Sequence, residues 1–337
     1  MDRNVTIDIA KGIGIILVVL GHLSSPQYDI GWLSHMHAFI YQFHMPLFFF
    51  LSGMFLKTEE TWKVFLKKKI TRLYVPYVVS NLVFLAIYVV AHFLNSEQTV
   101  PINTVKHAIK IVLGMAVTPL GGATWFLFVL FIAQVALYML HVSLRKINEH
   151  YLTIFLVLAA IAGMLIQPES LAAKSLVAMS FLDLGQTMSP TGLRTLQKES
   201  APFRYGLVIL FTGVVVIGSI TNTVDMSQGE YGNPILFYLF SMAGIMMLFY
   251  VSDILSKTQI LKSFLCYLGT STIWILIFHF LAFRVVNIIQ IITYHEEFNT
   301  VFSHPCARLS GLWPVVYFIA GISIPLTFKS LYRAKNA

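Results

Sequence analysis

Residues 8–22 read DIAKGIGIILVVLGH and residues 42–56 read QFHMPLFFFLSGMFL, with a short polar turn between these two apolar segments. Lys11 and His22 are eleven residues apart, and only Gly, Ile, Leu and Val separate them. At about 100° and 1.5 Å per residue, a helix brings both side chains to one face, about 16 Å apart. A cation and an imidazole on one face of a membrane helix are costly unless they interact with a polar group there. We therefore expect the fold to be organised around this face.

The composition indicates a polytopic membrane protein. Hydrophobic residues make up 57% of the 337 residues and charged residues 11%, whereas a soluble domain is about a quarter charged. We expect an all-α transmembrane helical bundle that forms a single domain over residues 1–337, with no appended soluble domain. Its apolar runs are each close to the ~20 residues of a spanning helix. They predict about ten spans: 5–23, 35–56, 75–94, 124–142, 151–167, 171–188, 205–222, 234–254, 268–292 and 311–328.

The positions of Lys and Arg predict the orientation, because these residues accumulate in cytoplasmic segments. With a cytoplasmic N-terminus and C-terminus, 17 of the 23 basic residues fall in inner segments and 3 in outer segments. This asymmetry accounts for the net charge of +8 without a nucleic acid as partner. The inner residues are Arg3, Lys57, Lys63, Lys67, Lys68, Lys69, Arg72, Arg145, Lys146, Arg194, Lys198, Arg204, Lys257, Lys262, Lys329, Arg333 and Lys335; the outer ones are Lys106, Lys110 and Arg308; Lys11, Lys174 and Arg284 lie within spans.

Two connecting segments predict helices that lie along the membrane interface. The outer segment 95–123 carries Lys106 and Lys110 four residues apart, which places both charges on one face of an amphipathic helix. The inner segment 59–74 is its counterpart, and it continues into the third span at Pro76.

Three side chains from different helices are expected at one depth, near the outer side of the membrane. His22 lies about 25 Å along its helix, Trp125 follows the GGAT turn at 121–124, and Arg284 lies about 16 residues along the ninth span. Together they suggest a cavity for a substrate, and His279, midway along the ninth span, is a further candidate for its lining. Trp125 could instead anchor the aromatic belt, and His279 could be a buried structural imidazole.

Basic residues gather at the inner mouth of the bundle. Lys11, three residues after Asp8, is either a cation for an anionic ligand or a lysine that snorkels beside that carboxylate. Lys69 and Arg72 lie three residues apart at the start of the third span. The guanidinium fork of Arg72 matches the geometry of a phosphate, and the lysines just before this pair are interpreted as topology signals.

The sequence offers little support for a metal site or a hydrolase. His35, His37 and His44 could be imagined as ligands, but His44 lies about 10 Å deeper than His35, and no Cys or Glu completes a set. His35 and His37 fit ordinary interfacial residues, and no metal is expected. The motifs of nucleotide-binding loops, zinc proteases and serine hydrolases are absent.

Five segments together resemble acyltransferase family 3, a family of membrane-bound enzymes, and in particular its fucose 4-O-acetylase-like branch. The hallmark of that family is a basic residue followed eleven positions later by a histidine, here Lys11 and His22, with Lys where Arg is usual. The family's basic pair at the third span falls on Lys69 and Arg72. The segments are DIAKGIGIILVVLGH (8–22), FHMPLFFFLSGMFL (43–56), KITRLYVPY (69–77), ATWFLFVLF (123–131) and LGTSTIWILIFH (268–279).

The resemblance implies an O-acyltransferase, most often an O-acetyltransferase, of the bacterial inner (cytoplasmic) membrane. Such enzymes move an acyl group from cytoplasmic acyl-CoA, usually acetyl-CoA, to a hydroxyl of a cell-surface glycan or its lipid-linked precursor. An imidazole suits removal of the hydroxyl proton, so His22 is the expected general base, with an acyl-His22 intermediate as a variant. The alternative readings are a polytopic transporter of a glycan or small molecule and a non-catalytic partner in glycan assembly.

Overall fold

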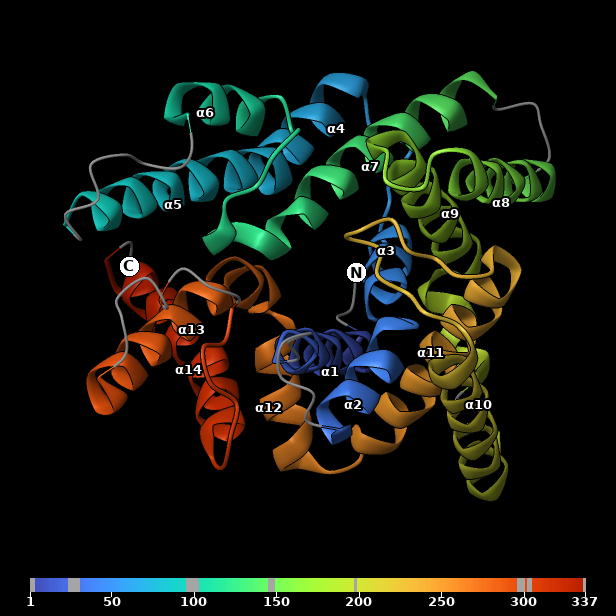
Figure 1. The fold of residues 1–337 in the computed structure, drawn as a ribbon. Helices are drawn as coiled ribbons and strands as arrows, with labels where there is room; N and C mark the ends of the chain where they lie inside the picture. The colour runs from blue at the N-terminus through green and yellow to red at the C-terminus, as the bar shows by residue number, and fades with distance from the viewer. Residues whose placement is uncertain are drawn as a thin grey trace. The chain divides into compact units, whose positions relative to one another are not determined.

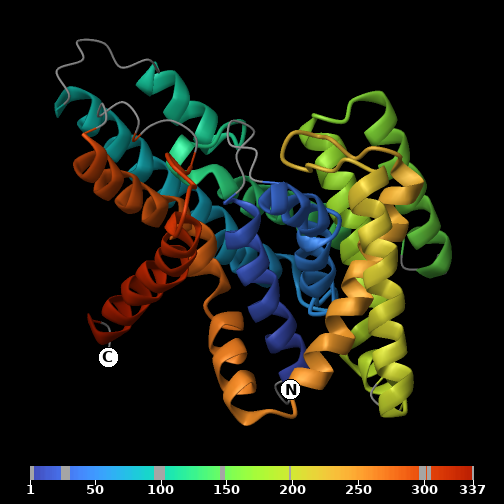
Figure 2. The ribbon, with the colours of Figure 1, turned by 60° about the horizontal axis from the view of Figure 1, so that its bottom comes forward.

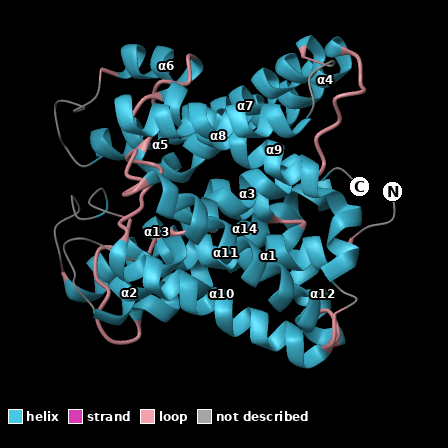
Figure 3. Cartoon of the chain, turned by 90° about the vertical axis from the view of Figure 1, so that its right-hand side faces the viewer, coloured by secondary structure: helices cyan, strands magenta, loops and turns pink. Residues whose placement is uncertain are grey.

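The computed structural model describes residues 4–23, 31–94, 103–144, 149–196, 199–295, 301 and 305–335. Arg3, Arg145, Lys146, Lys198 and the polar turn at 24–30 lie outside the described residues. Within those ranges the regular structure is helical (Figure 3), and an isolated β-bridge joins Asp225 and Glu230. The all-α prediction is therefore confirmed for the described part of the chain.

The chain divides into two compact units, and each is described by itself. The first unit contains Met1–Gly21, Ser34–Lys67 and Val129–Thr272. Its helices, labelled in Figure 1, are α1 (Val5–Gly21), most of α2 (Gly31–Tyr41), α3 (His44–Gly53), most of α4 (Trp62–Lys69), the later part of α7 (Trp125–Ser143), α8 (Glu149–Ile166), α9 (Leu171–Leu196), α10 (Ala201–Thr221), α11 (Pro234–Leu255) and α12 (Gln259–Gly269).

The second unit contains His22–Leu33, Lys68–Phe128 and Ile273–Ala337. Its helices are the π-helix η1 (Ile70–Tyr74), α5 (Val75–Leu94), α6 (Thr104–Val112), the 3₁₀-helix η2 (Pro119–Thr124), the start of α7, α13 (Thr272–Tyr294) and α14 (Trp313–Lys335).

In the first unit, α1 packs along α12 (Figure 2), and α3 packs against α9 through backbone contact. A Cβ added to Gly185 of α9 would lie 2.0 Å from the carbonyl oxygen of Phe50, and one added to Gly53 of α3 would lie 1.9 Å from that of Leu182. Glycine is thus required on both sides of this crossing, as in other close contacts between membrane helices.

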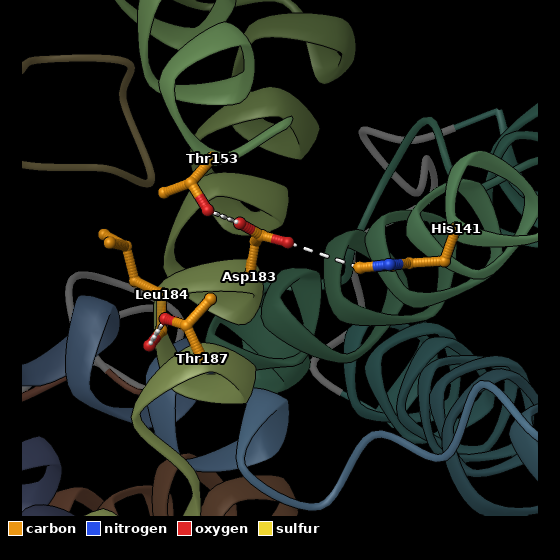
Figure 4. A network of polar contacts seen from close by, with 5 residues as sticks. All are labelled: His141, Thr153, Asp183, Leu184 and Thr187. Atoms are coloured by element: carbon orange, nitrogen blue, oxygen red, sulfur yellow. Dashed lines mark hydrogen bonds and ion pairs between the residues drawn. The ribbon is translucent and has the colours of Figure 1, made fainter. Parts of the chain in front are cut away.

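Buried charges in the first unit have partners. Asp183 of α9, only 2% exposed, accepts a hydrogen bond from Thr153 Oγ1 of α8 at 2.5 Å and lies 3.3 Å from His141 Nε2 of α7 (Figure 4). Arg204 of α10 donates through Nη1 to the Asp253 carboxylate of α11. These contacts tie neighbouring helices together, because a charge left alone in an apolar interior is costly.

The second predicted span, 35–56, is wrong as a single helix. The chain breaks at Gln42 and Phe43, between α2 and α3. Pro46, in the first turn of α3, has no N–H to donate to the carbonyl of Gln42 four residues earlier. That carbonyl instead accepts a 2.7 Å hydrogen bond from Ser241 Oγ of α11, which satisfies it inside the unit.

The ninth predicted span also begins later than expected. Residues 259–269 form the separate helix α12, and α13 starts only at Thr272 after a turn at Thr270 and Ser271. Six helices in the described part of the chain are long and apolar enough to cross a membrane: Trp62–Ala91, Pro119–Ser143, Ala201–Thr221, Pro234–Leu255, Thr272–Tyr294 and Trp313–Lys335. The total of about ten spans and the side on which the termini lie stay predictions.

Both predicted connecting segments contain a helix. The expected outer segment forms α6, which is capped by the Asn103 side chain accepting from Lys106 N at 3.0 Å. Tyr77 Oη donates to the Ala116 carbonyl at 2.6 Å and so ties the segment after α6 to α5. In the inner segment, the helix that begins at Trp62 continues without a break through η1 into α5, so the predicted run into the third span is confirmed.

Candidate functional site

His22 directly follows α1 and belongs to the second unit, where its half-buried ring contacts two residues of α13. The ring meets Phe280 edge-on, with centroids 4.7 Å apart, and lies 5.1 Å from the ring of His279 at a tilt of 44°. The thiol of Cys306 points at the carbonyl oxygen of His22, with 3.9 Å between Sγ and oxygen. Burial raises the pKa of this thiol, which keeps it protonated and able to donate.

His279 is fully buried, and its tautomer follows from its backbone contact. Nδ1 lies 2.9 Å from the carbonyl oxygen of Ile275, one helical turn earlier. A carbonyl can only accept, so Nδ1 carries the proton in the neutral ring and Nε2 keeps its lone pair. Nε2 has no hydrogen-bond partner within the described residues, which is uncommon for a buried polar atom.

The GGAT turn that precedes Trp125 packs against the same part of α13. A Cβ added to Gly122 would lie 2.6 Å from Cε2 of Phe280, so a larger residue would require that ring to shift. The turn is held from α5 by Asn81, whose Nδ2 donates to Thr124 Oγ1 at 2.7 Å and whose Oδ1 accepts from Thr118 N at 2.9 Å. Trp125, half-buried, is the first residue of α7.

A buried polar network holds the segment that carries Cys306. Arg284, one turn after Phe280 on α13, donates through Nη1 to the Val301 carbonyl. Asn287 Oδ1 accepts from Ala307 N at 3.2 Å and from Tyr317 Oη at 2.5 Å. Gln290 Nε2 donates to the Arg308 carbonyl at 3.0 Å. Side chains of α13 and α14 therefore hold the segment around Cys306, which contacts the backbone of His22.

The structure brings together part of the predicted cavity lining. His22 and His279 are in direct ring contact, and the turn before Trp125 reaches the same Phe280 ring. Arg284 lies one turn further along α13, with a guanidinium nitrogen committed to a backbone carbonyl. The roles expected for these side chains stay predictions.

The residues predicted at the inner mouth have separate surroundings. Lys11 belongs to the first unit, where its Nζ lies 4.8 Å from the centre of the Phe55 ring, a cation–π contact. Lys69 ends α4, and Arg72 lies exposed in the π turn η1. Such turns occur frequently at functional sites of helices.

The histidines of α2 and α3 contact backbone and aromatic groups of the first unit. His37 Nδ1 lies 3.1 Å from the Gly21 carbonyl oxygen, and its ring stacks on Tyr41. His44 Nδ1 lies 3.0 Å from the Ile40 carbonyl oxygen, while His35 is exposed. The described residues contain no group of three His, Cys, Asp or Glu side chains arranged to hold a metal ion.

Several residues that shape this site were not predicted from the sequence: Asn81, Phe280, Asn287, Gln290 and Tyr317. The available signal was the presence of uncharged polar residues inside apolar spans, at positions 81, 287 and 290. Buried amides in a membrane helix need partners, so each indicated a contact with a neighbouring segment.

Comparison with known proteins identifies the family. An acyltransferase domain matches residues 4–329. Nodulation protein NolL of Sinorhizobium fredii is 52% identical over 56 residues, and Nodulation protein NolL of Mesorhizobium japonicum is 48% identical over 58 residues; each match covers 15% of this chain and 15% of the relative. No solved structure matches. Because the acyltransferase domain extends over nearly its whole length, the chain belongs to acyltransferase family 3.

Proposed function

We propose that the protein is an O-acyltransferase of the bacterial inner membrane, and specifically an O-acetyltransferase, that moves the acyl group from cytoplasmic acyl-CoA to a hydroxyl of a cell-surface glycan or its lipid-linked precursor. The observation that carries the proposal is the half-buried imidazole of His22, in contact with His279 and Phe280, in a chain of an acyltransferase family. The acceptor is accordingly a molecule whose hydroxyl can reach His22.

In the proposed reaction His22 acts as general base. One ring nitrogen removes the proton of the acceptor hydroxyl while the oxygen attacks the thioester carbonyl. The carbon–sulfur bond breaks, the new ester forms, and the proton passes from His22 to the thiolate of CoA. General-base assistance of this kind is typically worth about 10²–10⁴-fold in rate. Transfer through an acyl-His22 intermediate would use the same nitrogen as the nucleophile.

The donor is proposed to bind through its phosphates at Lys69 and Arg72. The exposure of Arg72 leaves its guanidinium accessible to a soluble ligand, and its fork suits a phosphate. Lys11 is proposed to assist donor binding, with Lys11→Arg, the residue usual in the family, retaining function.

The test is transfer of labelled acetyl from acetyl-CoA by purified protein in liposomes, with glycan-containing membranes from a strain lacking the gene as acceptor. His22→Ala is expected to bind acetyl-CoA normally and to lose about 10²–10⁴-fold in rate. His35→Ala, which removes an exposed histidine of α2, is the matched control and should retain the wild-type rate. Near wild-type transfer by folded His22→Ala would refute the proposal, and absence of transfer by wild-type protein would favour a transporter.

Donor binding is tested separately by calorimetry. Arg72→Ala should weaken acetyl-CoA binding by about 1.5–3 kcal/mol, the value of one charge-assisted hydrogen bond. If Arg72 contacts the 3′-phosphate, dephospho-CoA should bind wild type and variant more equally. If Arg72→Ala binds acetyl-CoA as tightly as wild type, Lys69 and Arg72 do not bind the donor and only set the orientation in the membrane.

A further inference from the structure

We propose that His279 is the positioning residue of His22, holding it in the tautomer whose unprotonated nitrogen lies on the side away from His279. The proposal rests on the proposed function, since it assigns a role relative to the reacting imidazole. It starts from three observations in the second unit: the contact between the two rings, the full burial of His279, and its Nε2 atom without a partner.

The chemistry follows from the tautomer of His279. With its proton on Nδ1, engaged by the Ile275 carbonyl, the ring offers a lone pair at Nε2. His22 is a ring neighbour of this buried atom. If the His22 nitrogen that faces His279 carries the proton, it can donate to Nε2, and the opposite His22 nitrogen is left with a lone pair for the acceptor hydroxyl.

The distance between the rings allows this bond. A ring nitrogen lies about 1.1 Å from the centre of an imidazole, and an N–H···N bond spans about 2.9 Å, so two bonded imidazoles have centres about 5.1 Å apart. The observed separation is 5.1 Å. In the structure the ring planes are tilted by 44°, and Nε2 of His279 has no hydrogen-bond partner among the described residues, so the proposed bond requires the His22 ring to turn about its side-chain bond.

The surroundings hold His279 in place for this role. Its ring lies 4.4 Å from that of Phe280 and meets Phe283 edge-on at 5.7 Å. Phe283 in turn meets Tyr317 edge-on at 5.5 Å. Because His279 is fixed by packing and by the Ile275 carbonyl, it can orient His22 without moving itself. It touches neither donor nor acceptor in this proposal.

Two amide variants separate positioning from packing. In His279→Asn the amide can still reach the Ile275 carbonyl near the position of Nδ1 but offers no acceptor near Nε2. In His279→Gln the longer side chain returns an oxygen to about the position of Nε2. We expect His279→Asn to lower kcat by about 10–100-fold with KM for acetyl-CoA unchanged, and His279→Gln to retain most of the activity.

The pair is then tested by a double variant. If His279 acts through His22, His22→Ala combined with His279→Asn should be no slower than His22→Ala alone, because residues acting as one unit are not additive. Equal melting temperatures of the variants and wild type exclude a folding defect, and if His279→Asn fails to fold, His279→Leu takes its place in the same comparison. A wild-type kcat in the folded variant, or independent losses in the double variant, would overturn the positioning role while leaving His22 as the base. Full activity of His22→Ala would instead refute the proposed function itself.

Discussion

The contact between α3 and α9 allows a sharp test of the fold through Gly185→Ala. The new Cβ would lie 2.0 Å from the carbonyl oxygen of Phe50, whereas real Cβ contacts essentially never fall below 3.0 Å. The helices must therefore separate locally by about 1 Å. The obstacle is a backbone oxygen, which cannot rotate away as a side chain can, so the cost lies at the upper end of overpacking, about 3 kcal/mol.

A second term opposes this cost. Alanine in the interior of a helix is about 1 kcal/mol more favourable than glycine, so the net destabilisation expected for Gly185→Ala is about 2 kcal/mol. Gly213 of α10 provides the matched control, since a Cβ added there meets nothing within 4 Å. Gly213→Ala keeps only the favourable term. The two variants should differ in the free energy of unfolding by about 3 kcal/mol.

The measurement is reversible unfolding of purified protein in mixed micelles by titration with sodium dodecyl sulfate, followed by tryptophan fluorescence. Gly185→Ala should unfold at less denaturant than wild type, and Gly213→Ala at the same or more. If Gly185→Ala proves as stable as Gly213→Ala, the backbones of α3 and α9 do not meet as described, and the reasoning fails.

Three further predictions concern buried groups and orientation. Asp183→Ala should lower the free energy of unfolding by about 1–3 kcal/mol because the Thr153 hydroxyl loses its acceptor and the His141 ring loses the neighbouring carboxylate; Thr187→Ala, which removes only an exposed bond to its own helix, should change it by less than about 0.5 kcal/mol. Maleimide should alkylate Cys306 at least about tenfold more slowly than the less buried Cys266, because burial raises the pKa of the Cys306 thiol; equal rates measured by mass spectrometry would contradict its burial. Reporter fusions after residues 100 and 230 should read outside and those after 60, 147 and 335 inside, and an outside C-terminus would contradict the orientation taken from Lys and Arg.

The sequence alone was sufficient for the helical class and for several elements. Apolar runs of membrane-spanning length leave the backbone no other way to satisfy its polar groups, so helices had to follow. The amphipathic segment around Lys106 and the continuous helix through Arg72 were both predictable, because each depends on residues close together in the chain. The motif around Lys11 and His22 also led to the correct family.

The tertiary structure decided which residues meet. The break at Gln42 is stable because the hydroxyl of Ser241, far along the chain, donates a hydrogen bond to the freed carbonyl of Gln42. His279 and Phe280 become the neighbours of His22, and Asn81 holds the turn before Trp125. Helical periodicity assigns a side chain to a face of its own helix but does not say which other helix packs there. Contacts between distant segments depend on the packing of the folded chain, and the candidate site consists of such contacts.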